Sequence, residues 1–177
     1  IKHRLEHIDI TRIRDVKDNI NYWQETYSGT GIFPPKGSGS IEEDLLEDRW
    51  NNLIKAIHTT GEITKRNIEL KELEGEFYYG GNNLILIEIG SLRYKTLMNG
   101  WLNHLYLSAN SSYHSKTLII SKKINHKKQI NFEVTKELLP ITAKEATKIL
   151  SEINQIAANG KESCWPVPPE SGLAYAL

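Results

Sequence analysis

The sequence predicts an α/β fold, or α+β by a strict count, in which helices pack around a central mixed sheet of about five strands. Three observations support this fold class. Residues Leu84 to Ile89 are apolar except for Glu88, and such a run is typical of a strand at the centre of a sheet, covered on both faces. Shorter strand-like segments lie on both sides of this run. Several other segments place apolar residues at helical spacing.

Two helices are expected before the sheet. Residues 9–27 carry apolar side chains at three- and four-residue steps, namely Ile13, Val16, Ile20, Trp23 and Tyr27. Residues 29–39 are rich in glycine and proline, so they should form a loop, which is also the best hinge candidate. Ser40 and Glu43 form a capping-box pattern, from which a second helix should run to about residue 58.

Three strands are expected between residues 62 and 89, where the helical spacing ends. Gly75 and the turn Gly80–Asn83 should separate these strands, and the last two should pair as a hairpin through that turn. A helix should follow at residues 93–109, because its apolar residues make one stripe: Leu97, Trp101, Leu105 and Tyr106.

The rest of the chain predicts two more strands and a final helix. The strands should cover residues 117–121 and 129–134 and be joined by a basic turn at residues 122–128. The helix should cover residues 142–159, with a capping box formed by Thr142 and Glu145 and an end at Gly160. Prolines then hold the last segment extended.

Length and composition indicate an ordinary globular domain. The chain has 177 residues, which suggests one compact domain, with a helical part at 1–60 and a sheet-and-helix core with a proline-rich tail at 61–177. Because the chain opens without methionine, we expect a fragment excised from a longer protein. A lone Cys164 cannot form an internal disulfide, and no stretch approaches the roughly 20 apolar residues of a membrane span, so a cytoplasmic location is the simplest expectation.

Acidic residues near the central strands raise the question of nuclease chemistry. In a nuclease built on two adjacent strands, Mg²⁺ needs an aspartate on the first strand and an acid-x-lysine triplet on the second. Here Tyr78 stands in place of the aspartate, and Glu88-Ile89-Gly90 has glycine in place of lysine. If Glu74, Glu76 and Glu88 converged, they could bind Mg²⁺ weakly. We nevertheless expect no catalytic residue and no metal site.

Two of the polar residues have simple structural interpretations. Glu88 can lie on a polar strip or pair with Arg93 instead of binding a metal. His104 lies on the helix after the central strands, without a serine or cysteine nucleophile motif beside it, so we expect a hydrogen-bonding role in packing.

Basic residues gather in two places that could contact DNA. The predicted turn carries Lys122, Lys123, His126, Lys127 and Lys128. The first strand and the segment after the third strand carry Lys65, Arg66, Lys71, Arg93 and Lys95. Lys plus Arg and Asp plus Glu are equal at 22 each, so any contact with nucleic acid must be local. The turn can release counterions from phosphates or form a solvated hairpin tip, and the second set can line a groove or charge a sheet edge.

The proline-rich tail is a candidate contact surface. Its prolines keep the backbone extended and leave Trp165 and Val167 free to pack. These side chains can pack onto the same domain or against another subunit, and the sequence leaves both alternatives open.

Four motifs in order give the chain a family resemblance. They are Thr30–Pro35 (TGIFPP), Gly75 opening a strand pair, Trp101–Leu105 (WLNHL), and Trp165–Tyr175 (WPVPPESGLAY). In this order and spacing they resemble the C-terminal region of RecC, the gamma chain of exodeoxyribonuclease V. The resemblance implies a PD-(D/E)XK nuclease-like domain that has lost catalysis and works within the RecBCD helicase-nuclease.

The resemblance also implies a function and partners. It implies structural and DNA-guiding roles in double-strand break repair and recombination, with RecB-like and RecD-like subunits and double-stranded or forked DNA as partners. No membrane, small-molecule substrate or cofactor is implied for this domain, although the parent complex uses ATP and Mg²⁺. Two alternatives stay open, which are a weak Mg²⁺-dependent nuclease and a pure protein-interaction module.

Overall fold

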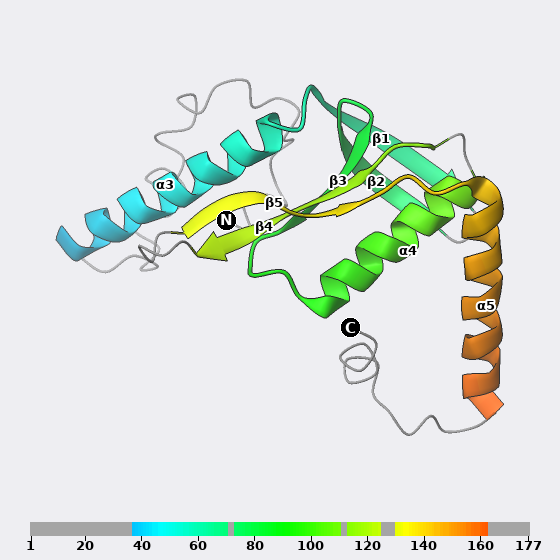
Figure 1. The fold of residues 1–177 in the computed structure, drawn as a ribbon. Helices are drawn as coiled ribbons and strands as arrows, with labels where there is room; N and C mark the ends of the chain where they lie inside the picture. The colour runs from blue at the N-terminus through cyan, green and yellow to red at the C-terminus, as the bar shows by residue number, and fades with distance from the viewer. Residues whose placement is uncertain (1–36, 71–72, 111–112, 125–129, 163–177) are drawn as a thin grey trace.

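The computed structural model describes residues 37–70, 73–110, 113–124 and 130–162 (Figure 1). The elements follow in the order α3 (Gly37–His58), β1 (Ile63–Leu70), β2 (Leu73–Gly80), β3 (Asn83–Glu88), α4 (Tyr94–Asn110), β4 (Thr117–Ile124), β5 (Ile130–Leu138) and α5 (Ala143–Glu162). The helix predicted at 9–27 and the proline-rich tail lie outside the described residues. Among the described helices, none is long and apolar enough to cross a membrane.

The five strands form one mixed sheet in the order β1-β2-β3-β4-β5, which confirms the predicted α/β fold. All neighbours pair antiparallel except β3 and β4, which are parallel. A parallel pair needs a crossover connection, and α4 supplies it. The predicted hairpin is also confirmed, because Gly80 pairs with Asn83 across a turn in which Gly81 has φ 58°.

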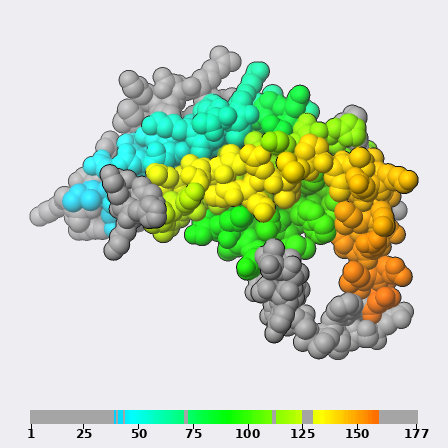
Figure 2. Space-filling model, viewed as in Figure 1, coloured from blue at the N-terminus to red at the C-terminus, as the bar shows by residue number. Residues whose placement is uncertain are grey.

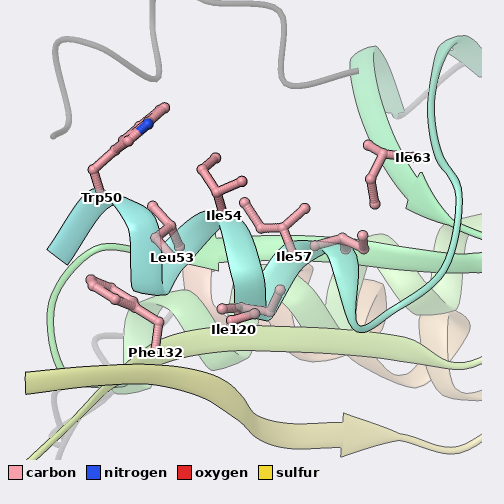
Figure 3. Packing of buried hydrophobic residues seen from close by; sticks show 9 residues of the cluster. Trp50, Leu53, Ile54, Ile57, Ile63, Ile120 and Phe132 are labelled. Carbon is pink, nitrogen blue, oxygen red and sulfur yellow. The ribbon is translucent and has the colours of Figure 1, made fainter. Parts of the chain in front are cut away.

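Helices cover both faces of the sheet. On one face α3 buries Trp50, Leu53, Ile54 and Ile57 against sheet residues that include Ile63, Ile120 and Phe132 (Figure 3). On the other face α4 lies so close to the sheet that a Cβ atom at Gly100 would sit 2.7 Å from Leu86 Cδ1. In turn α5 packs on α4, where Ala146 and Leu150 join Leu105 in a separate cluster. The predicted stripe of α4 is confirmed most clearly at Leu105, whereas Leu107, which is 1% exposed, was not part of the prediction.

Several predicted boundaries are wrong. Helix α3 begins at Gly37, inside the predicted loop 29–39, and α5 continues through Gly160 to Glu162. A glycine inside a helix costs about 1 kcal/mol relative to alanine but still donates its backbone hydrogen bond, so the helix can continue through it. The capping box of α5 is confirmed, since the Glu145 amide donates to Thr142 Oγ1 at 3.3 Å and the Thr142 amide donates to Glu145 Oε2 at 3.3 Å.

Three strand boundaries also differ from the prediction, and one of them is the end of β5, which runs to Leu138 and not to residue 134. Gly75 does not end a strand but lies inside β2, opposite Ile68. Its φ of 146° is a backbone angle that glycine tolerates. Strand β4 runs on to Ile124, so Lys122 and Lys123 belong to the strand and not to a turn. They pair with Phe132 and Asn131 of β5, because the backbone ladder continues regardless of the charge of the side chains.

Candidate functional site

The last residue of β3, Glu88, is the acid that stands where a nuclease would keep a metal ligand. Its side chain is 8% exposed, and both carboxylate oxygens accept hydrogen bonds from the same chain. Arg93 Nη2 donates to Oε1 and Oε2, each at 3.1 Å, and the Gly90 amide donates to Oε1 at 3.2 Å. Thr96 Oγ1 on the first turn of α4 donates a short hydrogen bond to Oε2. The carboxylate thus joins β3, the following loop and α4.

These hydrogen bonds also decide the protonation state of Glu88. Burial alone would raise the pKa of this carboxyl group, because the charged form loses solvation. The hydrogen bonds from Thr96, Gly90 and Arg93, together with the charge of Arg93, outweigh burial and hold the pKa of Glu88 below its ordinary value. Glu88 is therefore an ionised acceptor whose lone pairs are already used by donors, and the predicted pairing with Arg93 is confirmed.

The other two acids proposed as metal ligands lie on the opposite face of the sheet. Side chains alternate between the two faces of a strand. In β2, Tyr78 packs with the α3 cluster, so the even-numbered residues of this strand face α3. In β3, Glu88 shares the face of Leu84 and bonds to Thr96, so it faces α4. Glu74 and Glu76 share the face of Tyr78, and Glu76 forms an ion pair with Lys65 at 2.5 Å. The three carboxylates do not converge. Within the described ranges, no group of three or more His, Cys, Asp or Glu side chains could hold a metal ion.

The basic residues of the β4–β5 hairpin are partly described. Lys122 is half-buried on the α3 face, opposite Phe132, and its amide donates to Gly90 O at 2.9 Å. Lys123 is exposed on the other face and pairs closely with Glu133. His126, Lys127 and Lys128 lie outside the described residues. The two described lysines thus project from both faces of the same end of the hairpin.

The second basic set is distributed over separate surfaces. Lys65 and Arg66 are neighbours in β1 and point to opposite faces, and Arg66 stacks over the Tyr79 ring at 4.5 Å from its centroid. Strand β2 lies between β1 and β3, so these residues do not adjoin Arg93, which pairs with Glu88, or Lys95 on α4. Lys71, like Trp165 and Val167 of the tail, lies outside the described residues.

A buried polar network around His104 joins α4 to the sheet. His104 is 3% exposed, and its Nε2 lies 3.0 Å from Leu139 O, which can only accept, so Nε2 carries the proton. Its Nδ1 then accepts from Thr117 Oγ1 at 2.9 Å. The Tyr113 ring lies edge-on to the imidazole, and its hydroxyl accepts from the Leu84 amide at 3.0 Å. The predicted packing role of His104 is confirmed, whereas no sequence signal identified Thr117 and Tyr113 as its neighbours.

Replacing Glu88 by alanine should destabilise the domain by about 2 kcal/mol, because the half-buried donors of Gly90 and Thr96 lose their acceptor. The melting temperature should fall by about 4–8 °C at this size. Glu152→Ala is the matched control, since this exposed acid only makes a 3.9 Å pair with Lys148 on α5. Equal melting temperatures for Glu88→Ala and the wild type would contradict a role for Glu88 in joining β3 to α4.

The fold and the site define an α/β domain with a mixed five-stranded sheet, in which the acid at the end of the central strand stabilises the structure. A family model described as the RecC C-terminal domain matches residues 2–177, so the chain belongs to the RecC C-terminal domain family. This confirms the resemblance found in the sequence motifs and supports a role as part of a RecC subunit, within the multi-subunit exodeoxyribonuclease V complex. A comparison with curated proteins gave no match.

Proposed function

We propose that this chain is a non-catalytic domain of a RecC subunit with a PD-(D/E)XK nuclease-like fold, which supports the RecBCD complex and guides DNA during double-strand break repair and recombination in the cytoplasm. The observation that carries the non-catalytic part is the use of Glu88. Its two oxygens accept hydrogen bonds from Arg93, Thr96 and the Gly90 amide, so the carboxylate serves the fold. Neither ATP nor Mg²⁺ is proposed to bind this domain.

The separation of the candidate acids within the described part of the chain supports the same proposal. Hard divalent cations take several oxygen ligands at one point, and Glu74 and Glu76 face away from Glu88. Tyr78 packs with the α3 cluster and so points away from Glu88 as well. A weak nuclease would have to bring an acid from the other face through the sheet, which the backbone pairing opposes.

The proposed DNA contact is the end of the β4–β5 hairpin. Lys122 and Lys123 present charge on both faces of this end, and Lys127 and Lys128 follow within a few residues in the sequence. The exposed pair between Lys123 and Glu133 does not oppose this use, because exposed ion pairs contribute little and can exchange for a phosphate. Such contacts would position DNA without reading its sequence.

Neutralising Lys122, Lys123, Lys127 and Lys128 together, each to glutamine, should weaken binding of forked DNA at low salt by at least tenfold. The slope of log Kobs against log[salt] should also become shallower by up to about 3.6, since each lost phosphate contact removes about 0.9 from this slope. A fluorescence titration with labelled forked DNA at several salt concentrations measures both quantities. The matched control replaces four lysines of β5 and α5 by glutamine, namely Lys136, Lys144, Lys148 and Lys161.

The outcomes of this titration separate the proposal from a pure protein-interaction module. Loss of binding in the hairpin variant but not in the control supports DNA guiding through this hairpin. Equal loss in both variants would indicate a general charge effect and would contradict the proposed site. No binding by the wild type at low salt would favour the interaction module, in which RecB-like and RecD-like subunits are the partners and Trp165 and Val167 are candidate contacts.

A cleavage assay tests the non-catalytic part of the proposal. The wild-type chain at high concentration should leave linear and forked DNA intact in Mg²⁺ because the three candidate acids do not converge. Products should be followed on denaturing gels. Cleavage that requires Mg²⁺ and disappears in Glu88→Ala, while the destabilised variant Gly80→Ala still cleaves, would establish the weak nuclease instead.

A further inference from the structure

Strand β5 forms one edge of the sheet. Its inner side pairs with β4, and no strand in the described part of the chain pairs with its outer side. Figure 2 shows β5 as a yellow band along the surface between α3 and the green residues of α4 and its neighbours. The outward N–H and C=O groups of an edge strand can hydrogen-bond to another extended backbone, and this chemistry selects a polypeptide strand over a helix or a nucleic acid.

A groove of about 340 Å³ follows this edge beside α3. It is lined by Asn52, Lys55 and Ala56 of α3, by Thr59 directly after this helix, and by four consecutive residues of β5, 131–134. Neighbours in a strand point to opposite faces, so a groove that touches four in a row runs along the strand's edge. Ala56 and Phe132, each 7% exposed, make its apolar part together with Val134, and an apolar side chain of an added strand would fit there.

The features that protect an edge strand from pairing lie beyond this groove. The register between β4 and β5 skips Thr135, which forms a bulge held by a 2.7 Å hydrogen bond to Ser121. Charged Lys136 and Glu137 follow the bulge. Bulges and charged side chains are the usual protection of a sheet edge. Here the bulge and two adjacent charges lie in the second half of β5, whereas residues 130–134 keep a regular ladder and carry only the charge of Glu133, which pairs with Lys123.

The charge at the groove predicts a second property of a segment that binds there. Lys55 lies at the groove and is exposed, and no acidic side chain of the described residues forms an ion pair with it. The acid on the β5 side, Glu133, is already neutralised by Lys123. The groove therefore has an unbalanced positive charge at its α3 side, which an acidic side chain of the bound segment would match.

We propose that residues 130–134 of β5 dock an extended segment of another polypeptide, which adds a strand to the sheet, inserts an apolar side chain beside Ala56 and Phe132, and places an acidic side chain near Lys55. A RecC subunit works in a multi-subunit complex, so other chains are present to supply such a segment. This docking site adjoins the proposed DNA contact, because its Glu133 pairs with Lys123, but peptide binding can be measured without DNA and does not depend on it.

The test uses the complete chain and a phage-displayed library of random nine-residue peptides. Enriched peptides should alternate apolar and polar residues and carry an acid two positions from an apolar residue. The best peptide is then synthesised with a fluorophore and titrated by anisotropy. Lys55→Glu should weaken its binding at least fivefold, and N-methylation of alternate backbone amides should weaken it more than tenfold, because strand pairing requires those N–H groups.

The controls make each outcome decisive. Lys144→Glu on α5 changes the net charge by the same amount as Lys55→Glu, but away from the groove, and should leave affinity unchanged. Strand addition should also slow hydrogen exchange of β5 amides at 130–134. Failure of the library to enrich any peptide, equal binding of the N-methylated peptide, or equal effects of Lys55→Glu and Lys144→Glu would each overturn the proposal.

Discussion

Gly80→Ala is expected to lower the free energy of unfolding by about 3 kcal/mol, which is the upper part of the usual cost of overpacking a core. A Cβ atom on Gly80 would lie 2.6 Å from Thr60 Cβ and 2.8 Å from Ile85 Cδ1. Real Cβ atoms do not approach other atoms this closely, so the backbone of the α3–β1 turn must move. Chemical denaturation followed by circular dichroism measures the loss.

This turn has little freedom to move. Thr60 Oγ1 donates to Ile57 O at 2.6 Å, and the Gly81 amide donates to Glu62 O at 2.8 Å. On the other side of the contact, Gly61 has φ 114°, and a Cβ there would lie 3.1 Å from the Gly81 nitrogen. The turn after α3 and the turn between β2 and β3 therefore touch through backbone atoms, and both depend on glycine.

A control and a rescue distinguish this contact from a general effect of losing glycine. Gly90→Ala should be nearly neutral, because a Cβ atom there meets only Glu88 Oε1, at an ordinary 3.4 Å. Adding Thr60→Gly to Gly80→Ala removes the two colliding atoms of Thr60 and leaves only the end of the Ile85 side chain in contact, so it should recover part of the lost stability. If Gly80→Ala were as stable as Gly90→Ala, the close contact of the two turns would be refuted.

His104→Ala is expected to lower the free energy of unfolding by about 3 kcal/mol, through a cavity and two broken hydrogen bonds. The hydroxyl of Thr117 and the carbonyl of Leu139 would both lose their hydrogen bond to the imidazole. Because Leu139 leads into α5 and His104 belongs to α4, the variant should also loosen the packing of these two helices. Hydrogen exchange of α5 amides measures that local effect.

The same residue should make stability depend on pH. Burial lowers the pKa of His104, and the hydrogen bond to Leu139 opposes this shift only in part. The unfolded chain, with an ordinary pKa of about 6.5, therefore binds the proton at a higher pH than the folded chain does. The contribution of neutral His104 is complete above that pH and decreases as the pH falls through the lowered folded pKa.

Two histidine variants separate the effect of protonating His104 on stability from the effect of protonating the acidic residues. Denaturation midpoints of the wild type and of His104→Gln should converge as the pH is lowered below about 6.5, because only the wild type pays for protonating the buried ring. His114→Gln replaces an exposed histidine and should follow the wild-type curve throughout. A constant difference between wild type and His104→Gln across this range would contradict the shifted pKa of His104.

Local patterns predicted the elements well because their causes are local. The apolar spacing of residues 93–109 and 142–159 anticipated α4 and α5 to within a few residues, and the run from Leu84 anticipated the central strand. Misplaced ends occurred where glycine was taken as a stop signal, at Gly37, Gly75 and Gly160. Glycine weakens a helix or strand without removing a hydrogen-bond donor, so it does not force an end.

The candidate site was predictable only in part. The missing acid-x-lysine triplet and the possible pair of Glu88 with Arg93 both follow from neighbours in the sequence, where a side chain can reach its partner directly. The placement of Lys65 and Arg66 relative to Arg93 does not follow in this way, because it requires the order of strands in the sheet. Likewise Thr117 meets His104 only through the crossover of α4.

By itself, the sequence determined the order of helices and strands, the buried face of each helix, and the family to which the chain belongs. Only the tertiary structure decided that Glu74 and Glu76 face away from Glu88, and that β5 keeps a free edge beside α3 within the described residues. The physical reason is that side-chain periodicity acts over a few residues, whereas strand register assigns faces through pairing between distant segments, and a shift of one residue reverses every face.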